Sequence, residues 1–316
     1  MIIIEMNGGL GNQLQQYALY EKFKALGKEV KLDTSWFTVK ESAAEKTTPD
    51  GKAREEKTTK RKLELSYFLK VTYEVCTIEE KQNILGNSSI LAKAFRKLHL
   101  TEDRRYTEHQ MYDEGLFKLE NRVLTGYWAC EAYYGDILPA LRQKLVFPPS
   151  DNPMNGKMKK QMGETNAVSI HLRRGDYLTP DNQQIFGGIC TRAYYERAME
   201  YIEKRVDEAH FYVFSDEPDY AQEFMEKVIG HRSDYTIVDI NHGKDSFYDI
   251  DLMSQCRHHI CANSTFSFWG ARLNARPDRI AVRPLKQKNG VDWYKPGAMK
   301  RLWPGWICID EEGKVW

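Results

Sequence analysis

Short apolar runs alternate with amphipathic segments through the C-terminal half of the chain, a pattern typical of strands that alternate with helices. The apolar runs predict strands at about 167–172, 210–214, 235–238, 258–262 and 280–282. The amphipathic segments predict helices at about 192–206, 218–228, 245–254 and over the residues that follow 265. Asp245 is the expected N-cap of the third of these helices. This order of elements predicts a parallel, doubly wound α/β sheet.

The N-terminus begins with the same kind of unit. Residues 2–4 predict a short buried strand, a helix is predicted at about 13–26, and residues 30–32 predict the next strand. The turn at 7–12 is rich in glycine, which allows a ligand to approach the free N–H groups at the start of the helix. Its spacing is not Gly-x-Gly-x-x-Gly, so the turn does not indicate a dinucleotide site.

The middle of the chain differs in composition. Residues 38–64 are rich in charged side chains and nearly lack large apolar ones, which predicts a solvated insertion. Two interpretations of this insertion stay open: a lid over an acceptor site and an ordinary surface insertion. Residues 65–145 carry mixed helical patterns, and the proline-rich segment 147–153 breaks regular structure. We therefore expect two domains, 1–150 and 151–316, with the charged insertion in the first.

Composition narrows the classes of partner. The formal net charge of +1 provides no general attraction to polyanions, so no nucleic-acid partner is expected and any anion site must be local. No apolar run approaches the roughly 20 residues of a membrane span, and the first apolar run is too short for a secretory signal. Six scattered cysteines without metal-ligand spacing indicate reduced thiols. A cytoplasmic location is the resulting expectation.

Polar clusters follow several of the predicted strands, at 171–176, 215–217 and 263–267. In open α/β sheets the carboxyl ends of the strands form the edge at which ligands bind. The adjacent Arg173 and Arg174 are costly to place beside a core unless an anion or acidic side chains compensate them. The sequence is compatible with a phosphate clamp and with a structural ion-pair cluster.

These clusters suit a nucleotide diphosphate. Residues 263–265 enter a helix and offer hydroxyl and backbone N–H groups to a pyrophosphate. Taken alone, this cluster fits an ordinary N-cap better, and the other clusters favour the pyrophosphate. The Asp216 carboxylate matches the adjacent N–H donors of a guanine edge. Arg173 and Arg174 would neutralise the charge that grows on a leaving diphosphate.

The sequence offers no convincing metal site. Asp249 and Asp251 form a nominal Asp-x-Asp pair, but they fall within a predicted helix, where residues two apart point to different faces. His171, His258 and His259 lack the spacing of metal ligands. We therefore expect neither a metal nor a cofactor.

Four motifs, at 8–18, 171–176, 214–217 and 262–271, together resemble the alpha-1,2-fucosyltransferases of glycosyltransferase family 11, of the bacterial type. The resemblance implies a GT-B-type two-domain fold, with a Rossmann-like C-terminal domain that binds GDP-fucose and an N-terminal domain on the acceptor side. It implies inverting, metal-independent transfer of L-fucose to the 2-hydroxyl of a terminal galactose. The acceptor would be an oligosaccharide or a glycolipid, which is compatible with peripheral membrane association.

The resemblance also assigns residues. Arg173 and Asp176 are the expected catalytic residues. The expected donor-binding residues are His171, Arg174, Asp216, Asn263, Ser264, Thr265 and Phe266. The residues expected near fucose or the acceptor are Gly9, Gly11, Asn12 and Gln13.

Three points stay open. The general base could be Asp176, Asp181, Glu5 or Asp33; Asp176 is preferred, although it could equally orient the arginines. Gln15 stands where the family usually has phenylalanine, so the choice of acceptor could differ. A non-catalytic protein that binds a sugar nucleotide or a glycan, and a fucosyltransferase of different linkage, are the alternative functions.

Overall fold

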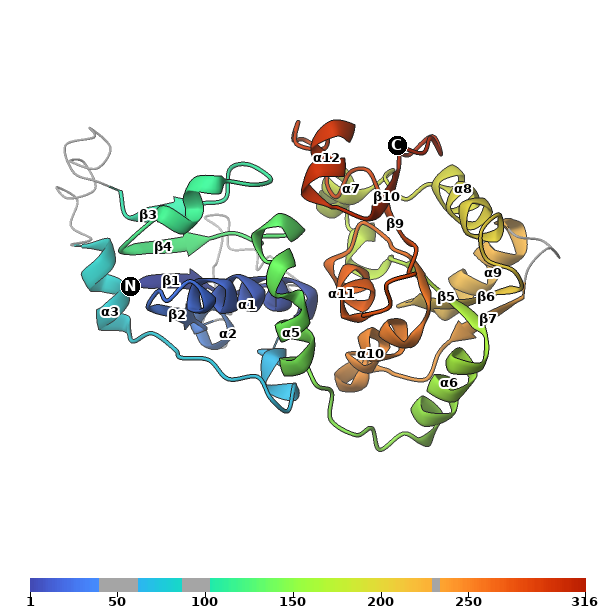
Figure 1. Cartoon of the computed structure of the whole chain (residues 1–316), viewed down its shortest axis with the longest axis horizontal. Helices are drawn as coiled ribbons and strands as arrows, with labels where there is room; N and C mark the ends of the chain where they lie inside the picture. The colour runs from blue at the N-terminus through green and yellow to red at the C-terminus, as the bar shows by residue number, and fades with distance from the viewer. Residues whose placement is uncertain (40–61, 87–102, 229–233) are drawn as a thin grey trace, which may run out of the picture. The chain divides into compact units, whose positions relative to one another are not determined.

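The computed structural model describes residues 1–39, 62–86, 103–228 and 234–316. The chain forms two compact units, Met1–Val146 and Phe147–Trp316, and each contains its own parallel β-sheet (Figure 1). The division falls at the start of the proline-rich segment 147–153. Most of the charged insertion predicted at 38–64 lies outside the described residues.

The N-terminal unit contains a sheet of order β2-β1-β4-β3 in which all neighbours are parallel. Its strands are β1 (Ile2–Glu5), β2 (Val30–Asp33), β3 (Arg105–Thr107) and β4 (Arg122–Thr125). Its described helices are α1 (Leu10–Ala25), α2 (Ser35–Val39), α3 (Ile78–Leu85) and α5 (Leu138–Lys144), with short 3-10 turns η1 (Glu64–Tyr67), η2 (Glu114–Lys118), η3 (Glu131–Tyr133) and η4 (Gly135–Ile137). The predicted strand–helix–strand opening is confirmed, but α1 begins before residue 13, at Leu10.

Strands β3 and β4 were not predicted from the mixed pattern of residues 65–145. β3 has only three residues, and both of its ends are exposed at the edge of the sheet. β4 has a buried centre of two residues, Val123 and Leu124, between polar ends. Such short apolar runs resemble pieces of a helix until pairing with β1 identifies them as strands.

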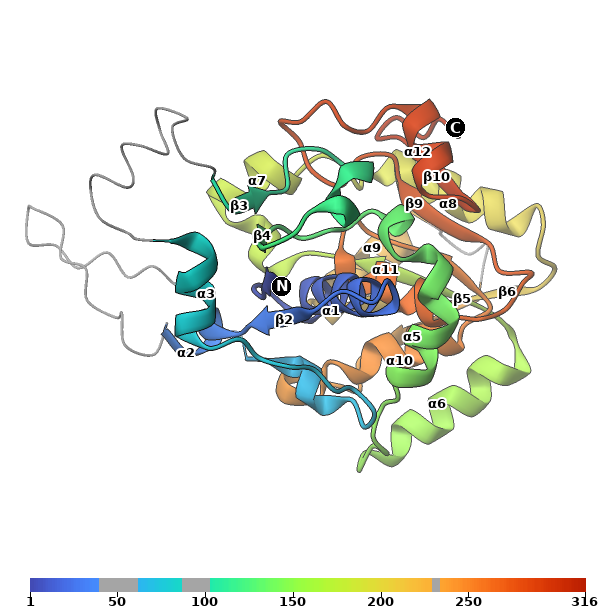
Figure 2. The ribbon, with the colours of Figure 1, turned by 60° about the vertical axis from the view of Figure 1, so that its left-hand side comes forward.

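The C-terminal unit contains a six-stranded sheet of order β10-β9-β8-β5-β6-β7, again parallel throughout (Figure 2). Its strands are β5 (Asn166–Leu172), β6 (Ala209–Ser215), β7 (Tyr235–Val238), β8 (His258–Ile260), β9 (Ala281–Pro284) and β10 (Trp306–Ile309). Its described helices are α6 (Pro153–Glu164), α7 (Pro180–Phe186), α8 (Arg192–Glu203), α9 (Pro218–Val228), α10 (Tyr248–Gln255), α11 (Thr265–Leu273) and α12 (Pro296–Leu302), with 3-10 turns η5 (Gly175–Leu178) and η6 (Gly243–Asp245). The predicted α/β class and doubly wound parallel sheet are confirmed.

Two local predictions in this unit are wrong. Asp245 is not a helix N-cap, because it ends the 3-10 turn η6 and α10 is capped by Phe247. The pattern predicts no strand after 280–282, yet β10 follows it and pairs with β9. The short β10 run follows a Pro-Gly turn directly, so only its pairing distinguishes it from a loop.

Strand alternation places the two faces of β5 against different helices. Val168, Ile170 and Leu172 pack in the core that α8 and α9 cover, whereas Ala167 packs with residues of α6 and α10 on the other face. His171 lies on that second face, since its ring centroid is 5.8 Å from that of Phe266 in α11. The histidine therefore reaches the beginning of α11.

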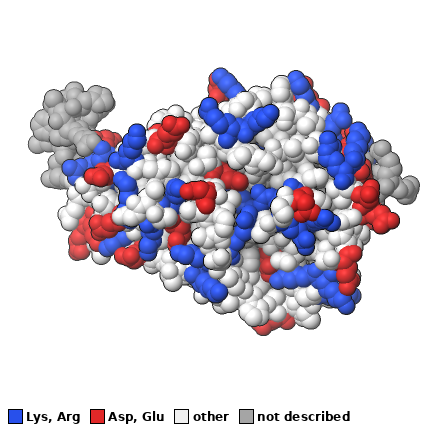
Figure 3. All heavy atoms as spheres, viewed as in Figure 1, with Lys and Arg blue, Asp and Glu red and all other residues white. Residues whose placement is uncertain are grey.

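The surface carries mixed charge. On the face in view in Figure 3, lysine and arginine side chains alternate with aspartate and glutamate side chains over both units. Within the described part of the chain, no helix combines the length and the apolarity that a bilayer-spanning segment requires.

Candidate functional site

Strands β5, β6 and β8 bring the polar clusters to one edge of the C-terminal sheet. Leu172 pairs with Ser215, and Ile170 pairs with Ile260, so the residues that follow each strand leave the sheet on the same side. This edge is the carboxyl-end edge at which open α/β sheets bind ligands. The sheet therefore gathers segments that are far apart in the sequence.

Arg173 lies between two carboxylates at this edge. Its Nη1 donates to Oδ2 of Asp216 at 2.9 Å, and its Nη2 donates to Oδ1 of Asp176. The guanidinium also lies 5.3 Å from the ring centroid of Tyr177. The side chain is 22% exposed, so it is held in place while part of its fork of donors faces solvent. The ion-pair cluster considered from the sequence is present, and it orients the arginine.

Arg174 is held by a neighbouring set of contacts. Its backbone N–H donates to Oδ1 of Asp216 at 3.0 Å, and its Nε donates to Oε2 of Glu217 at 3.1 Å. Its guanidinium stacks 3.8 Å from the ring centroid of Tyr220. Both oxygens of Asp216 thus bind the arginine segment, so this residue fastens the end of β5 to the end of β6. Its role as a guanine contact stays a prediction.

Gly175 is a site residue that the sequence reasoning did not single out. Its φ is +43°, and a Cβ at this position would collide with the Asp216 carboxylate. The glycine therefore lets the backbone pass close to Asp216 so that Arg173 and Arg174 can bind it. The signal for this role in the sequence is a glycine directly after two adjacent arginines.

His171 is buried and neutral. It is 5% exposed, and its Nδ1 has no hydrogen-bond partner. Burial, assisted by the charge of Arg173, lowers the pKa of His171 to about 3. At neutral pH the ring can therefore donate or accept a hydrogen bond, but it carries no charge toward a phosphate.

The Asn263 side chain binds other residues of the C-terminal unit. Its Nδ2 donates to the backbone oxygens of Phe186 and Gln287, both at 3.1 Å, and its Oδ1 accepts from the Cys190 thiol at 3.4 Å. The side chain is also 3% exposed. Asn263 thus connects three segments near the edge, and direct contact with a diphosphate is not its evident role.

The first turn of α11 is the better candidate for anion binding. Ser264 is its N-cap, yet the Ser264 side chain makes no capping hydrogen bond. Thr265 and Phe266 form the start of the helix and are partly exposed. The positive end of the helix dipole favours an anion here.

The glycine turn of the N-terminal unit is built tightly around its own side chains. Gly9 is the N-cap of α1, and Gly8 has a φ of +80° where a Cβ would meet the Asn12 side chain. Gly11 is buried in the first turn of the helix. The Gln13 amide is fully buried. It donates to the backbone oxygens of Gly8 at 3.1 Å and Lys62 at 2.8 Å.

Gln13 also accepts a hydrogen bond from the backbone N–H of Glu64 at 2.8 Å. These bonds use both ends of its amide, so Gln13 fastens the 62–64 segment to α1. The amide is therefore committed to the fold, and the place of Gln13 beside fucose or the acceptor stays a prediction.

Two of the four general-base candidates are poor proton acceptors. Burial raises the pKa of Glu5, but hydrogen bonds from Lys81, Thr125 and Arg105 outweigh it and leave the pKa below its usual value. Burial also raises the pKa of Asp33, but hydrogen bonds from Lys81 and Ser35 outweigh it and leave that pKa lowered. A carboxylate with a lowered pKa takes up a proton less readily. Asp176 at the arginine cluster and the exposed Asp181 in α7 remain.

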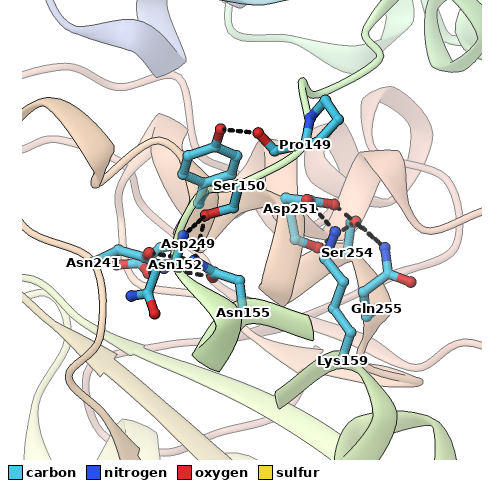
Figure 4. A network of polar contacts seen from close by, with 11 residues as sticks. Pro149, Ser150, Asn152, Asn155, Lys159, Asn241, Asp249, Asp251, Ser254 and Gln255 are labelled. Atoms are coloured by element: carbon cyan, nitrogen blue, oxygen red, sulfur yellow. Dashed lines mark hydrogen bonds and ion pairs between the residues drawn. The ribbon is translucent and has the colours of Figure 1, made fainter. Parts of the chain in front are cut away.

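Asp249 and Asp251 bind different partners (Figure 4). Oδ1 of Asp249 accepts from the Asn241 amide at 2.8 Å, and Asp251 pairs with Lys159 at 2.5 Å. The two carboxylates thus point to different faces of α10, as the helical spacing predicted. Across the described residues, no group of three or more histidine, cysteine, aspartate or glutamate side chains is arranged to hold a metal ion.

The model of glycosyl transferase family 11 matches residues 1–309. The chain belongs to this family. It is 30% identical over 307 residues to the O-antigen biosynthesis glycosyltransferase WbnK of Escherichia coli, which covers 89% of this chain and 93% of that protein. It is 28% identical to an alpha-1,2-colitosyltransferase of Escherichia coli, over 98% of this chain and 99% of that protein.

A mammalian relative matches a smaller part of this family 11 glycosyltransferase. The galactoside alpha-(1,2)-fucosyltransferase 1 of Oryctolagus cuniculus is 31% identical over 215 residues, which are 65% of this chain and 56% of that protein. The resemblance drawn from the four sequence motifs is therefore confirmed at the level of the family.

Proposed function

We propose that this family 11 glycosyltransferase transfers L-fucose from GDP-fucose to the 2-hydroxyl of a terminal galactose, with inversion at the fucose anomeric carbon. The carrying observation is that the arginine pair and the first turn of α11 lie at the same carboxyl-end edge of the sheet. Arg173, held by Asp216 and Asp176, supplies cationic donors, and α11 supplies backbone N–H groups. A diphosphate is the group that matches both.

The proposed reaction is a direct displacement. The acceptor hydroxyl attacks the anomeric carbon of fucose while the bond from that carbon to the diphosphate oxygen breaks. Negative charge then grows on the departing GDP, and the Arg173 guanidinium stabilises it because its position is set before the reaction begins.

The proton of the acceptor hydroxyl passes to a carboxylate. We assign this role to Asp176 because its position at the arginine cluster places it next to the group that would bind the diphosphate. Asp181 is the alternative base, because it is exposed at the start of α7 only a few residues away along the chain.

A second donor is supported by a specific observation. The alignment with the alpha-1,2-colitosyltransferase covers 98% of this chain. Colitose is L-fucose without its 3-hydroxyl, so both nucleotide sugars present the same GDP and the same anomeric carbon. Transfer of colitose is therefore the second candidate function.

A donor and acceptor assay tests these proposals. The protein is incubated with GDP-fucose or GDP-colitose and with lactose or lacto-N-biose, and NMR determines the linkage of any product. We expect an alpha-1,2-fucosylated galactose. Use of GDP-colitose alone would favour the second candidate, and another linkage would contradict the assigned specificity. GDP binding without any turnover would identify a non-catalytic binding protein.

A further inference from the structure

Arg283 is a buried cation in β9 without an acidic partner. Its side chain is 0% exposed, and its Nε donates to the backbone oxygen of Pro284 at 3.0 Å. Nη1 and Nη2 have no hydrogen-bond partner. Among the described residues, no carboxylate forms an ion pair with its guanidinium. The charge is therefore not neutralised by an ion pair.

Aromatic rings provide part of the compensation. The guanidinium lies 3.8 Å from the ring centroid of Trp303 and 4.6 Å from that of Phe268. Cation–π contacts of this kind stabilise a buried guanidinium, but they are weaker than the hydration it loses. Burial lowers the pKa of Arg283, yet arginine stays protonated in proteins. The interior of the unit thus contains a positive charge whose field is not cancelled locally.

This charge lies beside the segment that leads to α11. Strands β8 and β9 pair Ile260 with Val282, and the backbone N–H of Cys261 donates to Val282 at 2.9 Å. Arg283 is the next residue of β9, at the carboxyl end of that strand. It therefore lies at the same edge of the sheet as the start of α11. The end of β8 and the few residues that follow it connect this position to Ser264.

The field of Arg283 reaches this segment. Burial raises the pKa of the Cys190 and Cys261 thiols, and the charge of Arg283 opposes both rises. The Cys190 sulfur accepts a hydrogen bond from the backbone N–H of Asn263 at 3.2 Å. The influence of Arg283 thus extends to an atom in direct contact with the residue before the N-cap of α11.

We propose that Arg283 acts as a remote electrostatic positioning residue, whose uncompensated buried charge strengthens diphosphate binding at the first turn of α11 without touching the ligand. The inference rests on the proposed function, because it takes a nucleoside diphosphate as the ligand. A charge in a low-dielectric interior acts over a longer distance than one in water, so retention of a costly cation at this edge has a physical use.

Replacement of the charge by an apolar side chain tests the proposal. Arg283→Met keeps much of the volume, and Arg283→Lys keeps the charge. Affinity for GDP and for guanosine is measured by competition with a fluorescent GDP analogue. We expect Arg283→Met to weaken GDP binding roughly tenfold and to change guanosine binding less than about twofold. Arg283→Lys should restore most of the GDP affinity.

Arg257→Met is the matched control. Arg257 precedes β8 at the opposite edge of the same sheet and pairs with Asp278 at 2.6 Å on the surface. Its loss should leave the affinity for both ligands unchanged. If Arg283→Met does not fold, Arg283→Gln, which is neutral and can still donate to the Pro284 oxygen, takes its place in the same measurement.

The outcomes separate the two proposals. Equal weakening of GDP and guanosine would show a merely structural role and overturn the inference, as would unchanged GDP affinity in the neutral variant. Failure of the unmodified protein to bind GDP would instead overturn the proposed function, and the inference with it.

Discussion

At the scale of single residues, the surroundings of Arg173 set its geometry before any ligand arrives. Two carboxylates from different loops, Asp176 and Asp216, each accept one donor of its guanidinium. A group that is already oriented has less reorganisation to undergo as charge develops on a leaving group. The arginine is therefore suited to stabilise a transition state and not only to bind an anion.

Replacement of Arg173 by lysine should lower kcat by roughly a hundredfold while the fold is retained, because one ammonium group cannot reproduce the planar set of donors. Turnover of GDP-fucose and circular dichroism are the measurements. Arg192→Lys is the control, since Arg192 pairs with Glu196 on the exposed surface of α8. Near-normal turnover in the Arg173 variant would exclude its proposed role.

The general base can be identified by separate amide variants of Asp176 and Asp181. Replacement of the true base by asparagine should lower kcat by about a hundredfold or more. It should also remove the acidic limb from the pH profile of kcat. A carboxylate that only positions Arg173 should instead raise the Kd for GDP and leave the profile in place. Retention of the acidic limb in Asp176→Asn, with its loss in Asp181→Asn, would reverse our assignment.

At the scale of elements, two of the three buried glutamines of α1, Gln13 and Gln15, differ in their contacts. The Gln13 amide binds three backbone groups, whereas neither polar atom of Gln15 has a partner, and both side chains are 0% exposed. An unpartnered buried amide costs free energy, and a paired one stabilises the segment that it binds. The same residue type therefore has opposite effects within one turn of the helix.

Substitution by leucine should separate these effects. Gln13→Leu should lower the free energy of unfolding by about 2 to 3 kcal/mol, because three backbone groups lose their partner. Gln15→Leu should raise it by about 1 kcal/mol, because the desolvated amide is removed. Urea denaturation measures both, and each variant is the matched control of the other. Equal destabilisation would contradict the assignment.

At the scale of the whole molecule, the segment after the boundary between the units is tied into the C-terminal unit by a polar network (Figure 4). Asn155 exchanges hydrogen bonds with Asn241 at 2.7 and 3.0 Å and also donates to Ser150 at 3.0 Å. Asn241 in turn donates to Asp249. The network holds the segment at 150–155 against α10 and the exit of β7.

Asp249 makes the stability of this network dependent on pH. Burial, only partly opposed by the Asn241 hydrogen bond, raises the pKa of Asp249 from 3.8 to about 7. Between these values the folded protein retains a proton that the unfolded chain has lost, so stability falls as the pH rises. Asp249→Asn should remove this slope and raise the free energy of unfolding above neutral pH by about 1 to 2 kcal/mol.

Urea denaturation at about pH 5 and about pH 8 measures this effect. The Asn241 contact should survive in the variant, because the new amide retains an oxygen acceptor. Asp245→Asn, at an exposed position in η6, is the control and should not alter the slope. An unchanged slope in Asp249→Asn would place the pH dependence elsewhere.

Treatment with EDTA addresses the role of metal in the whole enzyme. We expect the transfer activity to change by less than about twofold, because Arg173 and the first turn of α11 supply the positive charge that a cation would otherwise provide. The assay uses GDP-fucose with lactose before and after dialysis. Loss of activity that a divalent ion restores would contradict this expectation and return attention to Asp249 and Asp251.

The sequence was most informative where the pattern is strongly periodic. Residues 167–172 and 235–238 are apolar enough to be recognised as strands, and both were placed within one residue of their ends. Strands β3 and β10 were missed because each is short and lies at a sheet edge, where pairing decides the structure. Asp245 was misassigned because a capping residue type does not distinguish a 3-10 turn from a helix start.

By itself, the sequence determined the α/β class, the positions of the polar clusters after their strands, and the family through four motifs. Only the tertiary structure decided what individual side chains do. It showed that Asp216 holds the arginine segment, that Gln13 binds backbone and that Arg283 is a buried unpaired cation. The physical reason is that periodicity reports burial along the chain, whereas hydrogen-bond partners and charge compensation depend on residues brought together from distant segments.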